Sequence, residues 1–165
     1  MDGVTFRGFL WSDIPAITAI YRHAVETDVA TFDTEAPGET AMAEKFGHLA
    51  DLRHPVTIAD RGGICVGYGY ASTYRPRPAY RFTCEDSIYL APDAQGRGLG
   101  STLLAKLIAD SRAFGFKQMI AVISAEKKNS VRIHEKQGFE LIGLHPKLGY
   151  KFDRWLDIVH MQKAL

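Results

Sequence analysis

The sequence predicts a single mixed α/β domain, and three observations support this prediction. The 165 residues are enough for one domain that buries a core without disulfide or metal support. Short apolar segments typical of strands alternate with longer segments whose apolar residues recur at helical spacing. No repeat, low-complexity segment or linker divides the chain. We therefore treat residues 1–165 as one domain.

The first half of the chain is predicted to form a strand, two helices and a β-hairpin. After a strand at 4–10, residues 11–27 form a helix with Ser12 or Asp13 as its N-cap and Pro15 in its first turn. One face of this helix is apolar: Ile14, Ile17, Ile20, Tyr21, Ala24 and Val25. A second helix lies within 37–55. The hairpin has strands at 56–60 and 63–72, with Arg61-Gly62-Gly63 at its turn.

The second half is predicted to start with a longer strand at 82–92, which ends at Pro92 and follows an Arg/Pro-rich segment. A glycine-rich segment then opens a helix whose buried stripe is Leu99, Leu103, Leu104, Leu107 and Ile108. The remaining elements are a strand at 118–124, a short helix at 129–138 closed by Gly138, and strands at 139–145 and 152–165.

Composition excludes several classes of protein. A net charge of +1, with 46% hydrophobic and 24% charged residues, is ordinary for a soluble protein and gives no sign of a nucleic-acid partner. No segment reaches membrane-spanning length, and "MDGVTFRGFL" lacks the features of a signal peptide. The two cysteines, Cys65 and Cys84, form no CxxC pair, and the histidines have no metal-site spacing. We expect a cytoplasmic protein without a metal.

The segment "DAQGRGLGSTLLAKL" places Gly96, Gly98 and Gly100 directly before an apolar helix. A dinucleotide-binding loop would need an acidic residue about 20 positions later, and the sequence there is "QMIAVI". A Walker loop would need a lysine after the last glycine, and none is present. Two interpretations remain: a flexible turn between strand and helix, or an anion site at a helix N-terminus, where exposed N–H groups and the helix dipole favour a pyrophosphate.

The residues "QGRGLG" at 95–100 resemble the Gln/Arg-x-x-Gly-x-Gly/Ala loop of the GNAT superfamily of acyl-CoA-dependent N-acetyltransferases. The segments "IYRHAVETDVATFDT", "YRPRPAYRFTCEDSIYL", "SVRIHEKQGF" and "GYKFDRWLD" are similar to the phosphinothricin N-acetyltransferase branch, which also acetylates methionine sulfoximine and methionine sulfone. The resemblance covers nearly the whole chain. It implies a mixed central sheet of about seven strands with a splayed central wedge and about four helices.

The resemblance also implies how acetyl-CoA is bound. Main-chain groups of Ile88, Tyr89 and Leu90 would hold the pantetheine arm in the wedge. The loop that would wrap the pyrophosphate is Gly96, Arg97, Gly98, Leu99, Gly100 and Ser101, where Arg97 either adds charge or is a solvated surface residue. The branch usually has Asn-x-x-Ser before its last helix, but here Lys127 replaces that asparagine. Either Lys127 or Asn129 contacts the cofactor, and Asn129 could instead only cap the helix, which is the interpretation that we favour.

Attack of an amine on a thioester requires a neutral amine, a stabilised oxyanion and a proton for the departing thiolate. By family position Glu85 is the expected base, although an isolated strand glutamate is more often part of a surface salt bridge. His134 is a candidate acid, and a helix histidine is otherwise packed or solvated. Cys84 beside Glu85 raises the alternative of an acetyl-enzyme. Strand alternation turns Cys84 to the opposite face, so we expect a buried core cysteine and direct transfer in a ternary complex.

We expect an N-acetyltransferase for the α-amino group of a small amino-acid-like substrate, working as a homodimer by family analogy. Arg75 or Arg77 would bind the substrate carboxylate, with Arg75 preferred. By the same resemblance, the remaining substrate-binding residues are Glu85, Asp86 and Ser87 around the amine and Phe32 and Tyr150 as pocket walls. Other possible functions are acetylation of an aminoglycoside or of a protein N-terminus, or acetyl-CoA sensing without catalysis.

Overall fold

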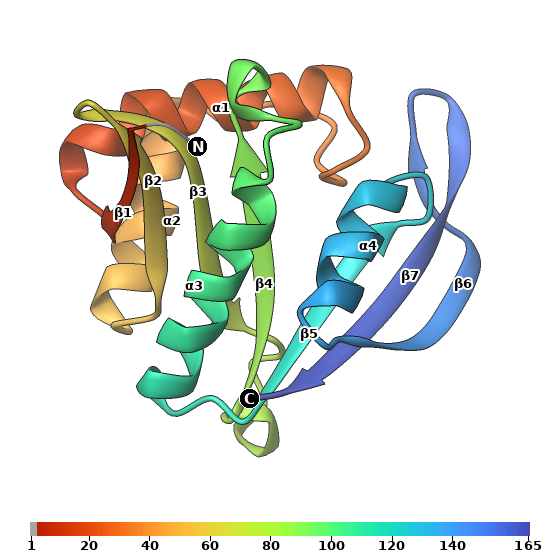
Figure 1. Cartoon of the computed structure of the whole chain (residues 1–165). Coiled ribbons are helices and arrows are strands. Elements are labelled where there is room, and N and C mark those ends of the chain that lie inside the picture. Colours follow the sequence, from red (N-terminus) through yellow and green to blue (C-terminus); the bar gives the residue numbers. More distant parts are fainter. Residues whose placement is uncertain (1–2) are drawn as a thin grey trace.

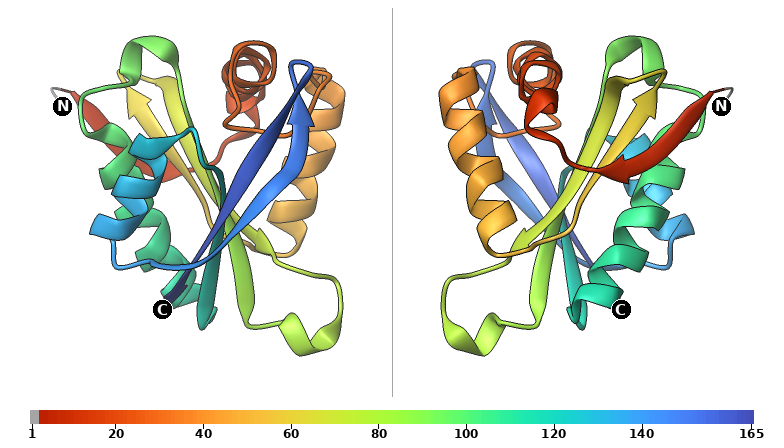
Figure 2. Two further views of the ribbon diagram at one scale, coloured as in Figure 1. Left: turned by 90° about the vertical axis from the view of Figure 1, so that its right-hand side faces the viewer. Right: turned by 90° about the vertical axis from the view of Figure 1, so that its left-hand side faces the viewer.

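The computed structural model describes residues 3–165, which form a seven-stranded mixed sheet with helices on both faces (Figures 1 and 2). The strand order is β1-β2-β3-β4-β5-β7-β6, and every neighbouring pair is antiparallel except β4 and β5. The strands are β1 (Val4–Gly8), β2 (Val56–Arg61), β3 (Ile64–Thr73), β4 (Thr83–Leu90), β5 (Gln118–Ser124), β6 (Glu140–Lys151) and β7 (Arg154–Ala164). The α-helices are α1 (Ile14–Thr27), α2 (Glu39–Asp51), α3 (Leu99–Phe114) and α4 (Lys128–Lys136). The expected mixed sheet is confirmed.

Two hydrophobic cores hold the helices on opposite faces of the sheet (Figure 2). Helices α1 and α2 pack on Tyr68 and Tyr70 of β3, whereas α3 covers the opposite face of β2, β3 and β4, in a cluster that includes Ala71 and Cys84. The apolar stripe predicted for α3 is confirmed, since all five of its residues are buried: Leu99, Leu103, Leu104, Leu107 and Ile108. The helical period in the sequence therefore identified the face that α3 turns to the sheet.

Asp13, one of the two residues predicted as the N-cap of α1, does occupy the N-cap position, but its side chain does not make the expected capping bond. Neither Ser12 nor Asp13 caps the helix with its side chain, and Trp11–Asp13 form a single 3₁₀ turn before it. The carboxylate of Asp13 instead accepts hydrogen bonds from the Leu10 backbone N–H at 2.8 Å and from the Arg7 guanidinium at 2.7 and 2.8 Å. Because Arg7 lies on β1, this acidic side chain ties the helix start to the sheet.

The C-terminal hairpin also corrects the sequence prediction. Strand β6 continues to Lys151 instead of ending at residue 145, and the turn falls on Phe152 and Asp153, which had been placed inside a strand. Both turn residues have positive φ, 53° and 55°. Such two-residue turns usually carry Asn or Gly, so a phenylalanine gave no turn signal.

The central feature of the sheet is the early separation of its two parallel strands. Strand β4 pairs with β5 only through Thr83–Glu85, opposite Gln118–Ile120. Beyond Glu85, β4 stays paired with β3 and β5 stays paired with β7, so the two halves of the sheet diverge (Figure 1). The splayed wedge expected at the centre of the sheet is therefore present.

Candidate active site

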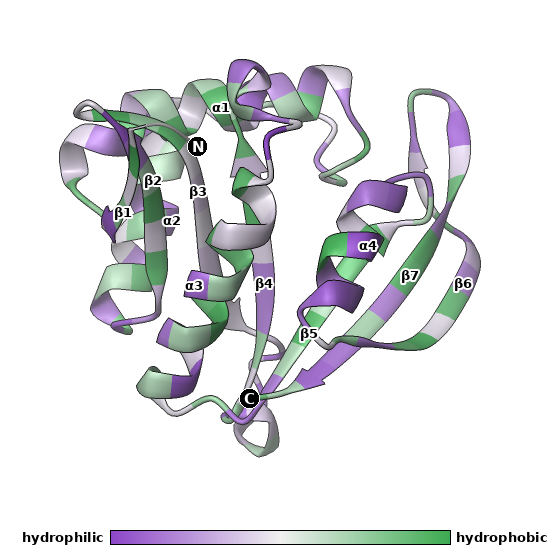
Figure 3. Ribbon diagram, viewed as in Figure 1, coloured by the Kyte–Doolittle hydropathy of each residue, from purple (hydrophilic) through white to green (hydrophobic). Residues whose placement is uncertain are grey.

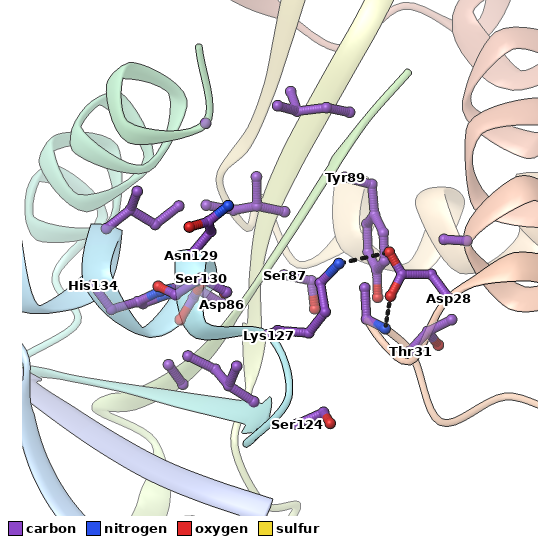
Figure 4. A pocket seen from close by; sticks show the side chains of 18 of the residues that line it. Asp28, Thr31, Asp86, Ser87, Tyr89, Ser124, Lys127, Asn129, Ser130 and His134 are labelled. Carbon is purple, nitrogen blue, oxygen red and sulfur yellow. Dashed lines mark hydrogen bonds and ion pairs between the residues drawn. The ribbon is translucent and has the colours of Figure 1, made fainter. Parts of the chain in front are cut away.

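A cavity of about 790 Å³ opens where β4 and β5 separate, with the loop after α1 and the first turns of α3 and α4 around it (Figure 4). It brings together most of the residues that the sequence predicted for the site. Those lining it are Phe32, Glu85, Asp86, Ser87, Ile88, Tyr89, Leu90, Gly96, Gly98, Gly100, Ser101, Lys127, Asn129 and His134. The predicted residues outside its lining are Arg75, Arg77, Arg97, Leu99 and Tyr150.

The glycine-rich loop leaves open space in front of the N-terminus of α3. Gly96 and Gly98 have φ of +76° and +80°, a backbone region that glycine adopts at little cost, and Gly98 is the N-cap of α3. A Cβ atom placed on either residue would meet no atom within 4 Å among the described residues. The side chain of Leu99 is buried in the core, so this residue can contribute only its backbone. The first N–H groups of a helix lack internal partners, so the loop is suited to bind an anion.

Glu85 lies at the apex of the wedge, in the last residue pair that joins β4 to β5. Its side chain is partly buried and lines the cavity. Burial and the neighbouring charge of Asp86 raise the pKa of Glu85, while the charge of Arg75 acts in the opposite direction. A carboxylate with a raised pKa is better matched to accept a proton near neutral pH.

The neighbouring strand residues confirm the predicted alternation at Cys84. This side chain is fully buried, its Sγ donates to the Gln118 carbonyl at 3.5 Å, and burial raises its pKa to about 12. A thiol of this kind is a poor nucleophile. Asp86 points to the same face of β4 as Cys84, where it contacts His134 of α4 through Nε2 at 3.1 Å.

The start of α4 carries Lys127 and Asn129, the two residues for which the sequence left a cofactor contact open. Lys127 Nζ donates to Asp28 Oδ2 at 2.7 Å, so its charge is already paired across the cavity (Figure 4). Helix α4 starts at Lys128, and Lys127 occupies the N-cap position. Asn129 therefore lies inside the first turn, exposed and facing the cavity, and the prediction that it caps the helix is wrong.

The expected substrate-binding residues outside the cavity lie on two exposed segments. The Arg75 guanidinium stacks 4.8 Å from the Tyr74 ring centroid in the loop between β3 and β4. Tyr150 is 54% exposed and packs edge-on against Trp155, with 5.1 Å between ring centroids. In this structure Tyr150 does not wall the cavity, because its strand position turns it outward on the β6–β7 hairpin.

One anchoring residue of the site was missed by sequence reasoning. The buried Lys151, at the end of β6, donates through Nζ to the backbone carbonyls of Asp28 at 2.7 Å and of Thr31 at 2.9 Å. Burial lowers the pKa of Lys151. These bonds hold the loop that carries Phe32 into the cavity. The partners are more than a hundred residues apart in the chain, so no local pattern marks them.

Comparison with known proteins agrees with this geometry. Residues 17–139 match the model of the acetyltransferase (GNAT) family. The chain belongs to the GNAT acetyltransferase family. The family match covers the wedge, the glycine-rich loop and α4, which are the parts that form the cavity.

This GNAT protein is 45% identical to a phosphinothricin N-acetyltransferase of Alcaligenes faecalis over 154 residues, 93% of this chain and 78% of that protein. It is 38% identical to an L-methionine sulfoximine/L-methionine sulfone acetyltransferase of Pseudomonas aeruginosa over 156 residues, 93% of this chain and 90% of that protein. A phosphinothricin acetyltransferase from Sinorhizobium meliloti, solved with acetyl-CoA, superimposes with a TM-score of 0.95 at 44% identity, covering 99% of this chain and 89% of that one.

Residues 3–165 contain no group of three or more His, Cys, Asp or Glu side chains arranged to hold a metal ion. None of the helices in this part of the chain is both long and apolar enough to cross a membrane.

Proposed function

We propose that residues 1–165 form one acetyltransferase domain that uses acetyl-CoA to acetylate the α-amino group of a small amino-acid-like substrate. The substrate class is that of phosphinothricin, methionine sulfoximine and methionine sulfone, on which the relatives named above act. The observation that carries the proposal is the single cavity in which the partly buried Glu85 at the apex of the wedge faces the same space as the open glycine loop.

The residues present fit acetyl-CoA, which would supply the thioester carbonyl that the amine attacks. The space in front of Gly96 and Gly98 is free of neighbouring atoms, and N–H groups at the start of α3 would bind the pyrophosphate. Main-chain groups of Ile88, Tyr89 and Leu90 lie beyond the last β4–β5 pair, so their edge of β4 is available to an extended arm. Arg97 is exposed beside this loop and would add charge to the pyrophosphate contact.

Glu85 is the proposed general base. Its raised pKa keeps the carboxylate basic enough to accept a proton from the substrate ammonium, directly or through a water. Transfer occurs directly from acetyl-CoA to the amine in a ternary complex, because the buried Cys84 cannot serve as an acyl carrier. His134 is the proposed source of the proton for the leaving sulfur, and it lines the same cavity.

Arg75 is the proposed partner of the substrate carboxylate, with Arg77 as the alternative in the same loop. Arg75 is close enough to Glu85 for its charge to lower the pKa of that carboxyl. An α-amino acid carries its carboxylate next to its amine, so a cation near the base suits this substrate class. Phe32 would pack on the substrate side chain, and Ser87 would accompany Glu85 on the same face of β4.

We also propose that the enzyme is a cytoplasmic homodimer that associates through the β6–β7 hairpin. Hydrophobic residues lie along both strands (Figure 3), and several are largely exposed: Leu141, Ile142, Leu144, Leu148, Tyr150, Phe152 and Trp155. A second copy of this hairpin would cover such a surface. Leu144→Glu should give a monomer in sedimentation velocity, and a dimer that persisted at micromolar concentration would contradict this interface.

The activity is tested by a kinetic screen with acetyl-CoA and a thiol reagent. We expect methionine sulfone, methionine sulfoximine and phosphinothricin to be acetylated with kcat/KM well above those of unmodified amino acids, an aminoglycoside and a peptide N-terminus. A preference for the aminoglycoside or the peptide would replace the proposed acceptor. Tight acetyl-CoA binding without turnover of any amine would instead indicate a sensor.

A further inference from the structure

Asp86 and His134 form a buried polar pair that joins the two sides of the wedge. They come from β4 and α4, and Asp86 is the first residue beyond the last β4–β5 pair. Their side chains are 3% and 4% exposed, and both line the cavity (Figure 4). Asp86 and Glu85 are consecutive strand residues, so their side chains point to opposite faces of β4. The pair therefore faces the cavity from the side opposite to the proposed base.

The hydrogen bonds of His134 determine where its protons lie. Nδ1 is 2.7 Å from the Ser130 carbonyl oxygen, which can only accept, so Nδ1 must carry a hydrogen. Nε2 is 3.1 Å from Asp86 Oδ2, and an ionised carboxylate oxygen also only accepts. A neutral imidazole has one N–H group, so both contacts are favourable only if the pair holds an additional proton. The raised pKa of His134 assigns this proton to the ring, which gives an imidazolium beside a carboxylate.

The carboxylate of Asp86 is the neighbouring charge that raises the pKa of His134. Burial alone would lower the pKa of His134, but the carboxylate of Asp86 and the hydrogen bond to Ser130 raise it above its usual value. The other titratable side chains on the elements around the pair are Cys84, Glu85 and Tyr89 on β4, Lys128, Arg132, Glu135 and Lys136 on α4, and Lys106, Asp110 and Arg112 on α3. Strand β5 contributes none.

The second oxygen of Asp86 is not used by the described part of the protein. Oδ1 is buried and has no hydrogen-bond partner among residues 3–165. An unpaired buried carboxylate oxygen is costly, and its cost falls when a donor from a ligand or a water fills the cavity. Asp86 thus contacts His134 through Oδ2, while Oδ1 is available to a donor from a ligand or a water in the cavity.

We propose that Asp86 is a positioning residue that keeps His134 doubly protonated, so that the hydrogen on Nε2 is the proton supplied to the leaving sulfur. This role rests on the acetyl transfer proposed above. In the free protein the Nε2 hydrogen is bonded to Asp86 Oδ2. In the transfer step the Nε2–H bond breaks and the sulfur takes the proton in place of Asp86 Oδ2, while Nδ1 keeps its own hydrogen, which it donates to the Ser130 carbonyl. Over one turnover the ammonium nitrogen of the substrate gives up two protons and the sulfur of the leaving thiol gains one. His134, which supplied that proton, regains one from solvent, so one proton is released overall.

The first test reads the protonation of His134 in the free protein. Asp86→Asn preserves the size of the side chain, and the introduced amide can donate to Nε2 of a neutral imidazole, so the contact survives without the extra proton. Long-range ¹H–¹⁵N spectra at pH 7.5 should show both nitrogens of His134 protonated in the wild type and only Nδ1 protonated in Asp86→Asn. A doubly protonated ring in the variant would overturn the proposal.

The second test uses the pH dependence of turnover. In Asp86→Asn, kcat at pH 8 should fall by about tenfold to a hundredfold, the scale of general acid catalysis, and should recover as the pH is lowered toward 6. KM for acetyl-CoA should change little. Asp110→Asn, which removes a carboxylate from the Lys106 ion pair on α3, is the matched control and should leave the pH profile unchanged.

A loss of kcat that is the same at every pH would show that Asp86 only supports the structure. Asp86→Asn combined with His134→Gln should be no worse than His134→Gln alone, because the two residues act as one unit. Additive losses would contradict this coupling. Wild-type protein that acetylates no amine would overturn the proposed function and this role together, whereas normal turnover in Asp86→Asn would overturn the role of Asp86 alone.

Discussion

Gly98 offers a direct test of the proposed acetyl-CoA site. Its positive φ affects the stability of the fold, whereas the open space in front of it is proposed to affect acetyl-CoA binding. Its φ of +80° means that most side chains would strain the backbone there, by about 1–2 kcal/mol. Valine or alanine would therefore lower stability as well as block the space in front of α3. Asparagine tolerates left-handed backbone, so Gly98→Asn separates the two effects.

The control is Gly62, in the β2–β3 turn, which has φ of +61° and also no atom within 4 Å of an added Cβ. Gly62→Asn and Gly98→Asn should each lower Tm by no more than about 2–4 °C, the change expected for about 1 kcal/mol in a chain of this size. Only Gly98→Asn should weaken acetyl-CoA binding, since its side chain fills the space proposed for the pyrophosphate.

The magnitude follows from the hydrogen bonds that would be lost. One charge-assisted hydrogen bond contributes about 1.5–3 kcal/mol, which corresponds to a rise in Kd of about tenfold to a hundredfold. Isothermal titration calorimetry measures Kd, and differential scanning calorimetry measures Tm. Equal acetyl-CoA affinities for Gly98→Asn and Gly62→Asn would refute the assignment of this loop.

Three further predictions concern Glu85, the exposed Arg75 and the Lys127–Asp28 ion pair. Glu85→Gln should lower kcat by about a hundredfold or more and leave the affinity for acetyl-CoA unchanged, and turnover of this variant within a few-fold of wild type would mean another base. In the wild type, activity should be lost as the pH falls through the raised pKa of Glu85. Arg75→Lys should lower kcat/KM for methionine sulfone by about tenfold to a hundredfold and much less for the corresponding amine without a carboxylate, with Arg77→Lys as the matched comparison. Asp28→Asn should free the Lys127 charge and favour phosphinothricin, whose side chain is anionic, over neutral methionine sulfone by about fivefold in kcat/KM; an unchanged ratio would place the substrate side chain away from Lys127.

Helix faces and glycine-rich turns could be predicted from the sequence, because residues close together in the chain determine them. The spacing of leucines identified the buried face of α3, and the glycines at 96 and 98 marked a backbone that needs positive φ. The prediction failed where the residue type gave only a weak local signal, or where the same side chain could bind either the local backbone or a residue of another element. Phe152 carries no typical turn chemistry, and Asp13 is the N-cap residue of α1, as predicted, but its carboxylate is bound by Arg7 instead of capping the helix.

The sequence by itself determined most of the elements, the position of the glycine-rich loop before α3 and, through resemblance, the residue types expected in the site. The tertiary structure alone decided which side chains are partners. Lys127, one of the two candidate cofactor ligands, is paired with Asp28, which lies 99 residues away in the chain. Asp86 looked like a neighbour of Glu85, but the pleat of β4 turns it to His134, 48 residues later in the chain. Local periodicity fixes the face on which a side chain lies, whereas the group that it meets depends on how remote segments pack, and in this cavity that packing pairs Lys127 with Asp28 and Asp86 with His134.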